Sequence, residues 1–586
     1  MKVLGLGYET HESGSALIED GRILAVVNEE RLTRVKMDEA APSRSAVECL
    51  RIANVTPEQI DLIALSGFPP FKKLTHFASY IYKPFIYTRG ASMAMTVFPN
   101  GSVVGGPLAW LYNAALSTGI PQYTLIYKRR LSQVLKRLPG FRGRIVHIPH
   151  HDCHSATAYF TGPYRDCLSA VVEGADWEHS FVIETVKDGD FKRIASTPWP
   201  HSPGAFYKLI TRILGFNPRR HAGKITGLAA FGDDRKEYDK VRALMWTEGM
   251  ELRVSPLVFS LHTEYVRTRK LPAYFGAPKR EDLAAAFQRV LEETVSLAVR
   301  RAVEMTGKKE IILAGGVCAN VKMNQRIQEI PGVTGVSIHP GMGDTGQPLG
   351  AALKAIDLEL RKRGQRLEPK AIDHVYVGPG YSDAEVESEL RKHGLAFERP
   401  ADPERSAAEA IHAGKVVCRF NGRMEYGPRA LGNRSILYHA RDATINDWLN
   451  KRLERTEFMP FAPSTLIEYA DQCYVNVAPS KYAAGFMTIT YDCTDWMRKS
   501  CPAVVHVDGT ARPQLVSKET NPTYHRLIDE YRKLSGIPSV VNTSYNMHEE
   551  PIVCSPNDAI RAFLRSGLDY LAIGPYWVKG TPGKSA

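Results

Sequence analysis

Two stretches of the sequence, residues 2–34 and residues 167–197, decide the fold because they repeat one arrangement. The first reads KVLGLGYETHESGSALIEDGRILAVVNEERLTR and the second reads CLSAVVEGADWEHSFVIETVKDGDFKRIAST. Each has an apolar run, a polar turn and two further runs, which are joined at Asp20-Gly21 in one and Asp188-Gly189 in the other. Asp-Gly between such runs is a strong hairpin signal. We therefore predict a domain duplicated into two halves that each open with three strands; two unrelated meanders would look the same.

The segments after these strands predict α/β architecture with nucleotide-binding character. Residues 284–303 have apolar positions at helical spacing. IILAGGVCANVKMNQRI indicates a strand, a Gly-Gly turn and a helix, and HPGMGDTGQPLGAALKAI indicates a glycine-rich turn and a helix. A buried strand that leads through glycines into a helix start is suited to phosphate, because unpaired backbone N–H groups point outward there.

A second domain is expected after a charged stretch. The chain has 586 residues, more than one hydrophobic core usually supports. Residues 360–373 lack an apolar face and contain a proline, so we place domains at 1–365 and 370–586. The second also alternates strands and helices. It includes an expected hairpin in AVVHVDGTARPQLV that turns at Asp508-Gly509, and a helix in SPNDAIRAFLRSG capped by Ser555.

Composition limits the classes of function. With 44% hydrophobic and 24% charged residues the chain is typical of a globular protein, and 75 Lys and Arg against 63 Asp and Glu would suit an anionic partner. An excess spread thinly over a large surface is the simpler explanation. Nine scattered cysteines without a C-x-x-C pair argue against a disulfide framework. The amino terminus turns polar early and no apolar run suits a membrane span, so a cytoplasmic location is expected.

The stretch PHHDCHSATAY places potential metal ligands close together. His150 and His154 are four residues apart, so in a helix both imidazoles lie on one face. Glu173 ends a predicted strand and Asp344 lies in the turn GMGDTG. Two imidazoles and two carboxylates suit Fe(II), Mn or Zn. The alternative is that the two histidines are simply hydrogen-bonded.

The segment CRFNGRMEYGPRALGNRSI indicates an anion site. It contains Arg419, Arg423, Arg429 and Arg434 among glycines. Arginine suits bidentate contacts with phosphate or carboxylate oxygens, although four arginines could equally form a solvated face. Arg455, Arg512 and the strand end NTSYN could complete the site. HAGKITG is not a Walker A motif, GLGYET lacks the third glycine of a dinucleotide fingerprint, and G-x-S-x-G is absent from the sequence.

Several motifs in order resemble the O-carbamoyltransferases of the nodulation-factor and antibiotic-tailoring family. They span nearly the whole chain: NEERLTRVK, PHHDCHSATAY, GKITGLAAFG, GGVCANVKMN, GDTGQPLGAA, GRMEYGPRALGNRSI, EFMPFAPS, HVDGTARPQ and NTSYNMHEEPIV. The resemblance implies an actin-like duplicated ATPase fold followed by a YrdC-like domain. It also implies two steps: carbamoyl phosphate and ATP give carbamoyl adenylate and pyrophosphate in the second domain. The first domain then passes the carbamoyl group to an acceptor hydroxyl and releases AMP.

The resemblance also implies roles for matching residues. His150, His154 and Asp344 fall on iron ligands, with Glu173 where the family has Asp, so the metal, expected as Fe(II), could differ. His11 is the expected base for the acceptor hydroxyl, and Glu12 follows it where Asp is usual. The adenylate in the first domain is expected to contact Lys224, Gly315, Gly316 and Asn320. Carbamoyl phosphate and ATP with Mg²⁺ are expected to contact Arg423, Arg429, Asn433, Arg434, Ser435, Arg455, Arg512, Asn542 and Ser544.

The acceptor is the least defined part. Aromatic and basic residues alternate between Phe68 and Leu138 and include Phe71, Phe77, Tyr80, Tyr82, Phe85, Tyr87, Lys72, Lys73, Lys83 and Arg89. YKRRLSQVLKRL follows, with Leu131, Val134, Leu135 and Leu138 on one side. This region could line an acceptor pocket, or it could be a packed helical cover or a dimer contact.

Two other functions were weighed against small-molecule O-carbamoyl transfer. A tRNA-modifying carbamoyl-adenylate enzyme would suit the net charge, but the chain has no basic tail and nucleic acid is not expected. A non-catalytic nucleotide-binding module would not need both the metal set and the arginine segment. The expected partners are therefore ATP, carbamoyl phosphate and a hydroxyl-bearing acceptor, with the oligomeric state left open.

Overall fold

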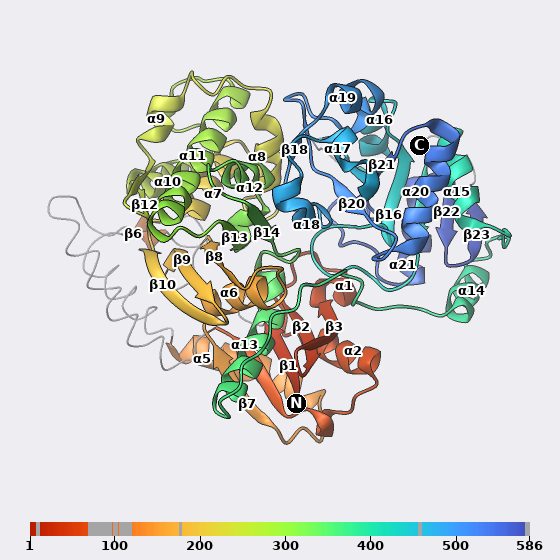
Figure 1. The fold of residues 1–586 in the computed structure, drawn as a ribbon, viewed down its shortest axis with the longest axis horizontal. Helices are drawn as coiled ribbons and strands as arrows, with labels where there is room; N and C mark the ends of the chain where they lie inside the picture. The colour runs from red at the N-terminus through yellow and green to blue at the C-terminus, as the bar shows by residue number, and fades with distance from the viewer. Residues whose placement is uncertain are drawn as a thin grey trace.

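The computed structural model describes residues 1–7, 12–67, 96–97, 103–104, 120–174, 179–454 and 460–580. Its larger sheets, in the part of the chain so described, are two of five strands and one of seven. The five-stranded sheets belong to the red-to-green part of the chain and the seven-stranded sheet to the cyan-to-blue part, which lies beside it (Figure 1). The residues described contain no helix that is both long and apolar enough to cross a bilayer.

The first sheet is built on the opening strands β1 (Lys2–Gly7), β2 (Gly14–Glu19) and β3 (Arg22–Asn28). They pair antiparallel, and Asp20 and Gly21 form the turn with φ angles of 48° and 84°. Two positive φ angles are typical of the tight turn that matches strand twist. The strands β4 (Leu62–Ser66) and β7 (Arg144–Ile148) then add in parallel, which gives the order β3-β2-β1-β4-β7.

The second sheet repeats this order. Its strands are β8 (Asp166–Val172), β9 (His179–Lys187), β10 (Asp190–Pro198), β13 (Glu310–Ala314) and β14 (Gly335–Ile338). They lie in the order β10-β9-β8-β13-β14, again three antiparallel strands followed by two parallel ones. Asp188 and Gly189 form the second turn, with φ of 50° and 79°. The predicted duplication and the α/β fold class are confirmed.

Helix α13 (Gln347–Arg361) packs tightly between the halves. It contacts β1 and also α6 (His150–Phe160), which in turn packs on β8 and β13. A Cβ atom on Gly5 of β1 would lie 1.8 Å from the Pro348 carbonyl oxygen, and one on Gly350 would lie 1.9 Å from the Cys153 carbonyl oxygen. Both contacts are therefore backbone to backbone, and only glycine allows them.

Helices cover the outer face of the second half. They are α7 (Pro203–Ile213), α8 (Ala222–Ala229), α10 (Leu257–Thr268), α11 (Arg280–Thr306) and α12 (Val321–Gln328). The long helix α11, which contains the expected 284–303 helix, contacts α7, α8 and α12. Their buried apolar side chains form one cluster with those of the sheet. This core fixes α8 and α12 relative to β13.

The seven-stranded sheet forms the centre of the rear part. Its order is β20-β17-β21-β16-β15-β22-β23, made of β15 (Val417–Phe420), β16 (Arg434–His439), β17 (Ala462–Leu466), β20 (Gln514–Val516), β21 (Ser539–Ser544), β22 (Tyr570–Ile573) and β23 (Tyr576–Lys579). Its helices include α14 (Asp383–Lys392), α15 (Pro403–His412), α20 (Pro522–Ser535) and α21 (Pro556–Ser566). Ser555 caps α21 as expected, through a bond from the Asp558 amide.

Two local predictions have clear outcomes. The hairpin expected at Asp508-Gly509 is wrong: the turn exists, and the His506 amide donates to the Thr510 carbonyl oxygen across it, but the strand partner of β19 (Thr510–Ala511) is β18 (Tyr491–Asp492). Turn residues indicate a reversal, not which strand becomes the partner. The apolar side of α5 (Ile120–Lys136) packs into the core through Val134, as the helical-cover alternative expects.

The other aromatic and basic residues that we considered for the acceptor lie outside the described residues. These are Phe71, Lys72, Lys73, Phe77, Tyr80, Tyr82, Lys83, Phe85, Tyr87 and Arg89. The nine cysteines are all buried and are not joined in disulfides.

Candidate functional site

The four predicted metal ligands meet in the first domain. Helix α6 begins directly after Pro149 and presents His150 and His154 one turn apart. Glu173 follows β8, and Asp344 begins the short 3-10 helix at Asp344–Gly346 after the glycine-rich turn. One ligand atom from each residue lies within 4.8 Å of every other. Elements from both halves of the duplication therefore converge on one point.

The spacing and chemistry of these atoms fit a divalent ion. His154 Nε2 lies 3.1 Å from Glu173 Oε1 and 3.4 Å from Asp344 Oδ1, and His150 Nε2 lies 3.5 Å from Asp344 Oδ1. Atoms bound about 2.1 Å from one ion stand about 3.0–3.4 Å apart at neighbouring tetrahedral or octahedral positions. Two imidazoles with two carboxylates, and no thiolate, suit a metal that accepts nitrogen and oxygen ligands.

The charges of the cluster are balanced. Burial opposes protonation of His154, but the carboxylates of Asp344 and Glu173 outweigh burial and raise the pKa of His154 to about 9. Burial alone would raise the pKa of Glu173, yet the contact with His154 holds it below its usual value. The Glu173 carboxylate therefore stays ionised and favours a positive charge beside it, whether on a proton or on a metal ion.

The Gly-Gly turn touches this cluster. Gly315 has a φ of 101°, and a Cβ there would lie 2.3 Å from the Val172 carbonyl oxygen. The next residue, Gly316, donates its amide to the Glu173 carboxylate. Glu12 also approaches, since a Cβ on Gly343 would be 3.4 Å from Glu12 Oε2. His11 lies outside the described residues, so its role stays a prediction.

Asn320 is placed by contacts inside its own domain. Its side chain caps α12 by accepting from the Met323 amide at 3.1 Å, and it exchanges two hydrogen bonds of 2.9 Å with Gln288 of α11. Tyr207 connects Gln288 to Thr226 on α8, the helix that carries Lys224. These contacts tie the turn to α8, but they occupy the Asn320 amide. Its expected contact with adenylate stays a prediction.

A cavity of about 430 Å³ lies between the two parts of the chain. Five predicted binding residues line it: Lys224, Arg429, Arg512, Asn542 and Ser544. Glu12 and Ala319, which neighbour the metal cluster and the glycine turn, line it as well. Seven Lys and Arg side chains against four Glu give its lining an excess of positive charge, which suits an anionic ligand.

Four other predicted residues form hydrogen bonds within the chain. Arg423 donates to the carbonyl oxygens of Gly378, Val377 and Leu24, and Arg434 donates to those of Asn421, Asn433 and Gly422. Asn433 and Ser435 bond to the loop around them. Among the described residues these four do not line the cavity, so their expected contact with carbamoyl phosphate or ATP stays a prediction.

Arg419 and Arg455 complete the set of arginines. Arg419 is buried and donates to the Gly432 carbonyl oxygen and to Thr523, so it too holds the loop. A planar guanidinium with five donors can satisfy several buried carbonyls at once, which explains these structural roles. Arg455 lies outside the described residues.

The rim of the cavity contains residues that the sequence reasoning missed. Arg220 pairs with Glu549 at 2.7 Å, and His221 Nε2 lies 2.9 Å from the same carboxylate. Burial opposes ionisation of Glu549, but His221 and Arg220 lower its pKa to about 2. Arg31 and Lys36 also line the cavity. The motif NEERLTRVK and the arginines before HAGKITG were the available signals, but neither says which cavity these side chains face.

Comparisons with known proteins cover most of the chain. The protein-family model described as "Carbamoyltransferase N-terminus" matches residues 2–353, and the family model described as "Carbamoyltransferase C-terminus" matches residues 408–580. The chain is 32% identical to "Nodulation protein NolNO" of Sinorhizobium fredii over 97% of this chain and 79% of that protein.

Two further matches are weaker. The chain is 26% identical to "3'-hydroxymethylcephem-O-carbamoyltransferase" of Streptomyces clavuligerus, over 70% of this chain and 75% of that protein. Among solved structures, it matches component A of (R)-2-hydroxyglutaryl-CoA dehydratase from Acidaminococcus fermentans at 16% identity and a TM-score of 0.34, over 62% of this chain and 100% of that chain.

Proposed function

This chain belongs to the carbamoyltransferase family, and from that premise we propose that it is an ATP-dependent O-carbamoyltransferase with a small-molecule acceptor. One observation carries the proposal: a positively charged cavity, lined by both parts of the chain, reaches Glu12, which lies beside the turn that carries the metal-type ligand Asp344. A relative named for O-carbamoyl transfer supports the choice of a hydroxyl acceptor.

The first step takes place in the rear domain, residues 370–586, which resembles YrdC. Carbamoyl phosphate and water give carbamate and inorganic phosphate. A carbamate oxygen then attacks the α-phosphorus of ATP, which enters with Mg²⁺, and pyrophosphate leaves. Arg429 and Arg512 bind the phosphate groups, since guanidinium donors stabilise the charge that builds up on phosphoryl oxygens. Asn542 and Ser544, at the end of β21, orient the carbamoyl end.

The second step takes place in residues 1–365. The acceptor oxygen attacks the carbamoyl carbon and AMP leaves, while His11 takes the hydroxyl proton. Lys224 and the Gly315-Gly316 turn hold the adenylate phosphate. His150, His154, Glu173 and Asp344 would hold a divalent ion, expected as Fe(II), which would supply Lewis acidity toward the carbamoyl group.

Isotope exchange tests the first step. We expect pyrophosphate to exchange into ATP only when carbamoyl phosphate is present. Arg429→Gln and Arg512→Gln should lower this exchange, whereas Arg405→Gln, which removes an exposed ion pair with Glu409 inside α15, should not. Purified protein that shows no such exchange would contradict the proposal. Mass spectrometry of acceptor mixtures, read for a carbamoyl increment, then identifies the acceptor.

A further inference from the structure

Helix α12 is held by both domains. It begins at Val321, is capped by Asn320, and follows the Gly315-Gly316 turn of the first domain after one short 3-10 helix, Gly316–Ala319. Along its length it contacts the rear domain: Asn324 donates to the Thr488 carbonyl oxygen at 2.8 Å and Gln328 donates to the Asn476 carbonyl oxygen at 2.7 Å. The side chains of Asn324 and Gln328 are buried. A buried polar contact of this kind fixes one relative placement of the two surfaces.

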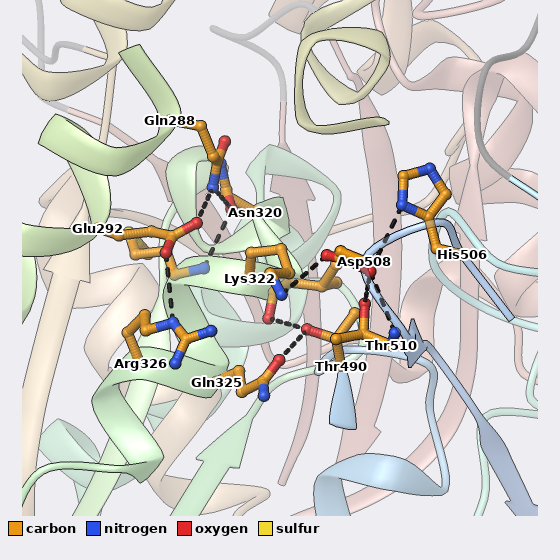
Figure 2. Close-up of polar contacts among 12 residues, drawn as sticks. Gln288, Glu292, Asn320, Lys322, Gln325, Arg326, Thr490, His506, Asp508 and Thr510 are labelled. Carbon is orange, nitrogen blue, oxygen red and sulfur yellow. Dashed lines mark hydrogen bonds and ion pairs between the residues drawn. The ribbon is translucent and has the colours of Figure 1, made fainter. Parts of the chain in front are cut away.

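The first turns of α12 form hydrogen bonds and an ion pair with the rear domain. Thr490 donates its hydroxyl to the Val321 carbonyl oxygen at 3.1 Å and to Gln325 Oε1 at 2.8 Å. Beside it, Lys322 Nζ lies 3.1 Å from Asp508 Oδ2. Figure 2 shows Lys322 on α12 pointing across the boundary toward Asp508, with Thr490 and Gln325 meeting next to them. Lys322 is 16% exposed and Asp508 26% exposed, so the pair is shielded from most solvent screening.

Asp508 also shapes the loop that carries Arg512. Its Oδ1 accepts from the Thr510 amide at 3.0 Å and from the Thr510 hydroxyl at 2.6 Å, and His506 Nδ1 lies 3.5 Å away (Figure 2). Burial opposes the charge on Asp508, but His506 and Lys322 hold its pKa far below the usual value. The Asp508 carboxylate thus joins the loop that carries Arg512 to helix α12, which follows the glycine turn.

Two cavities of different size meet at the pair, and the larger, of about 620 Å³, is lined by Lys322, Asp508 and residues of α11. The smaller is nearly closed. A cavity of about 30 Å³ is lined by Lys322, Asp508 and His506, together with Arg512 and Thr226, which also line the large cavity. Such a volume holds about one or two water molecules and no substrate. The pair therefore lies between the narrow space next to the large interdomain cavity and the second cavity of about 620 Å³, where an intermediate could leave if the domains separated.

We propose that Lys322 and Asp508 are a positioning pair, which fixes the glycine turn of the first domain against the Arg512 loop of the second so that the activated carbamoyl group reaches the acceptor without escaping. The proposal rests on the two-step function given above. Neither residue needs to touch a substrate. Both act through the elements they join, so their loss should change delivery of the intermediate and leave its formation intact.

Asp508→Asn and Lys322→Gln separate this role from the local turn. Asparagine keeps an oxygen for the Thr510 amide and hydroxyl but loses the charge that pairs with Lys322. Lys322→Gln leaves the turn untouched, and Lys322→Arg keeps the charge. Arg405→Gln removes ion pairs with Glu409 of α15 and Glu530 of α20, both inside the rear domain, and serves as the matched control. Thermal unfolding of each variant shows whether it is folded.

Two rates are measured. Exchange of pyrophosphate into ATP with carbamoyl phosphate reports formation of the adenylate. Added hydroxylamine attacks escaped carbamoyl adenylate, so N-hydroxyurea forms, AMP leaves and a proton passes to solvent. Only the ATP-dependent product counts, because carbamoyl phosphate also decomposes to cyanate, which gives N-hydroxyurea without enzyme.

We expect both variants to keep wild-type exchange while the ratio of trapped product to exchange rises about fivefold. The double variant should show a ratio of trapped product to exchange no higher than that of either single variant. Lys322→Arg and Arg405→Gln should show the wild-type ratio. An unchanged ratio, or exchange that falls in step with stability, overturns the proposal. Wild-type protein without exchange refutes the proposed function and this inference with it; wild-type exchange with unaltered variants refutes this inference alone.

Discussion

The metal-type cluster and the arginine-rich loop, residues 419–435, were both predicted from dense groups of chemically active side chains, yet only the cluster converges. All four predicted ligands face one point. Of the four arginines in the loop, only Arg429 lines the cavity, while Arg419, Arg423 and Arg434 donate to backbone carbonyls. Helical spacing fixes which way two histidines point, whereas a glycine-rich loop fixes no direction for an arginine.

The two regions also differ in how their charges are balanced. The cluster sets two carboxylates against two imidazoles and can accept a cation. Arg434 is fully buried and lies over the Phe420 ring at 3.6 Å with its donors on carbonyl oxygens. The cluster is available to a ligand, whereas Arg419, Arg423 and Arg434 donate to backbone carbonyl oxygens and leave Arg429 to face the cavity. Mutations should therefore separate function from stability.

The largest effect is expected at the cluster. His154→Ala removes a buried ligand and should abolish stoichiometric metal binding, with a loss of about a thousandfold in carbamoyl transfer, because a Lewis acid contributes several kcal/mol. Exchange of pyrophosphate into ATP should persist. Metal content by mass spectrometry and the two rates check this. Equal loss of exchange would show that the cluster serves the fold rather than transfer.

Arg434→Ala should destabilise the rear domain by about 3–4 kcal/mol, because it leaves a cavity and several buried carbonyls without donors. Chemical denaturation measures the change. Arg429→Gln is the control within the same loop and should keep the wild-type midpoint. A loss under about 1 kcal/mol for Arg434→Ala would remove the distinction between the arginines.

Arg512→Gln should raise KM for carbamoyl phosphate about thirtyfold and leave the free energy of unfolding unchanged, since a hydrogen bond to a charged group contributes about 1.5–3 kcal/mol. Steady-state exchange kinetics give the value. If KM holds while stability falls, Arg512 belongs with Arg434 as a structural residue.

The smallest effect concerns His339, which connects the two regions. Its Nδ1 lies 2.9 Å from the Thr161 hydroxyl and its Nε2 lies 3.2 Å from the hydroxyl of Tyr426 in the arginine loop; Tyr426 also donates to the Thr345 carbonyl oxygen, next to Asp344. Burial, and after it the charge of His154, lowers the pKa of His339 to about 3.

This shift makes stability depend on pH in one direction. Above pH ~6.5 the histidine is neutral in both folded and unfolded chains, so its contribution is complete. As pH falls from there toward about 3, only the unfolded chain gains the proton, and stability should fall by about 1.4 kcal/mol per pH unit. Denaturation at pH 7 and pH 5.5 measures the fall, and His339→Gln should reduce it. An equal fall in both proteins would assign it to other groups.

The sequence was informative where local spacing determines geometry. The two Asp-Gly turns, His150 with His154, and the cap at Ser555 all depend on residues a few positions apart, and the structure has them as expected. The hairpin at Asp508-Gly509 failed because strand pairing is decided by distant residues. Lys322 and Asp508 lie far apart in the chain, so the resemblance and the motifs gave no sign of their contact.

The close approach of α13 to β1 and α6 restricts how the first domain can move. Since the backbones meet at Gly5 and Gly350, no side-chain layer remains there to slide or repack when a substrate binds. Hinge closure between the duplicated halves, which many two-lobed enzymes use, would strain this contact. Substrates should instead reach the buried site through small shifts of the rear domain or of the cavity rim, while the two halves of the front domain keep their relative position.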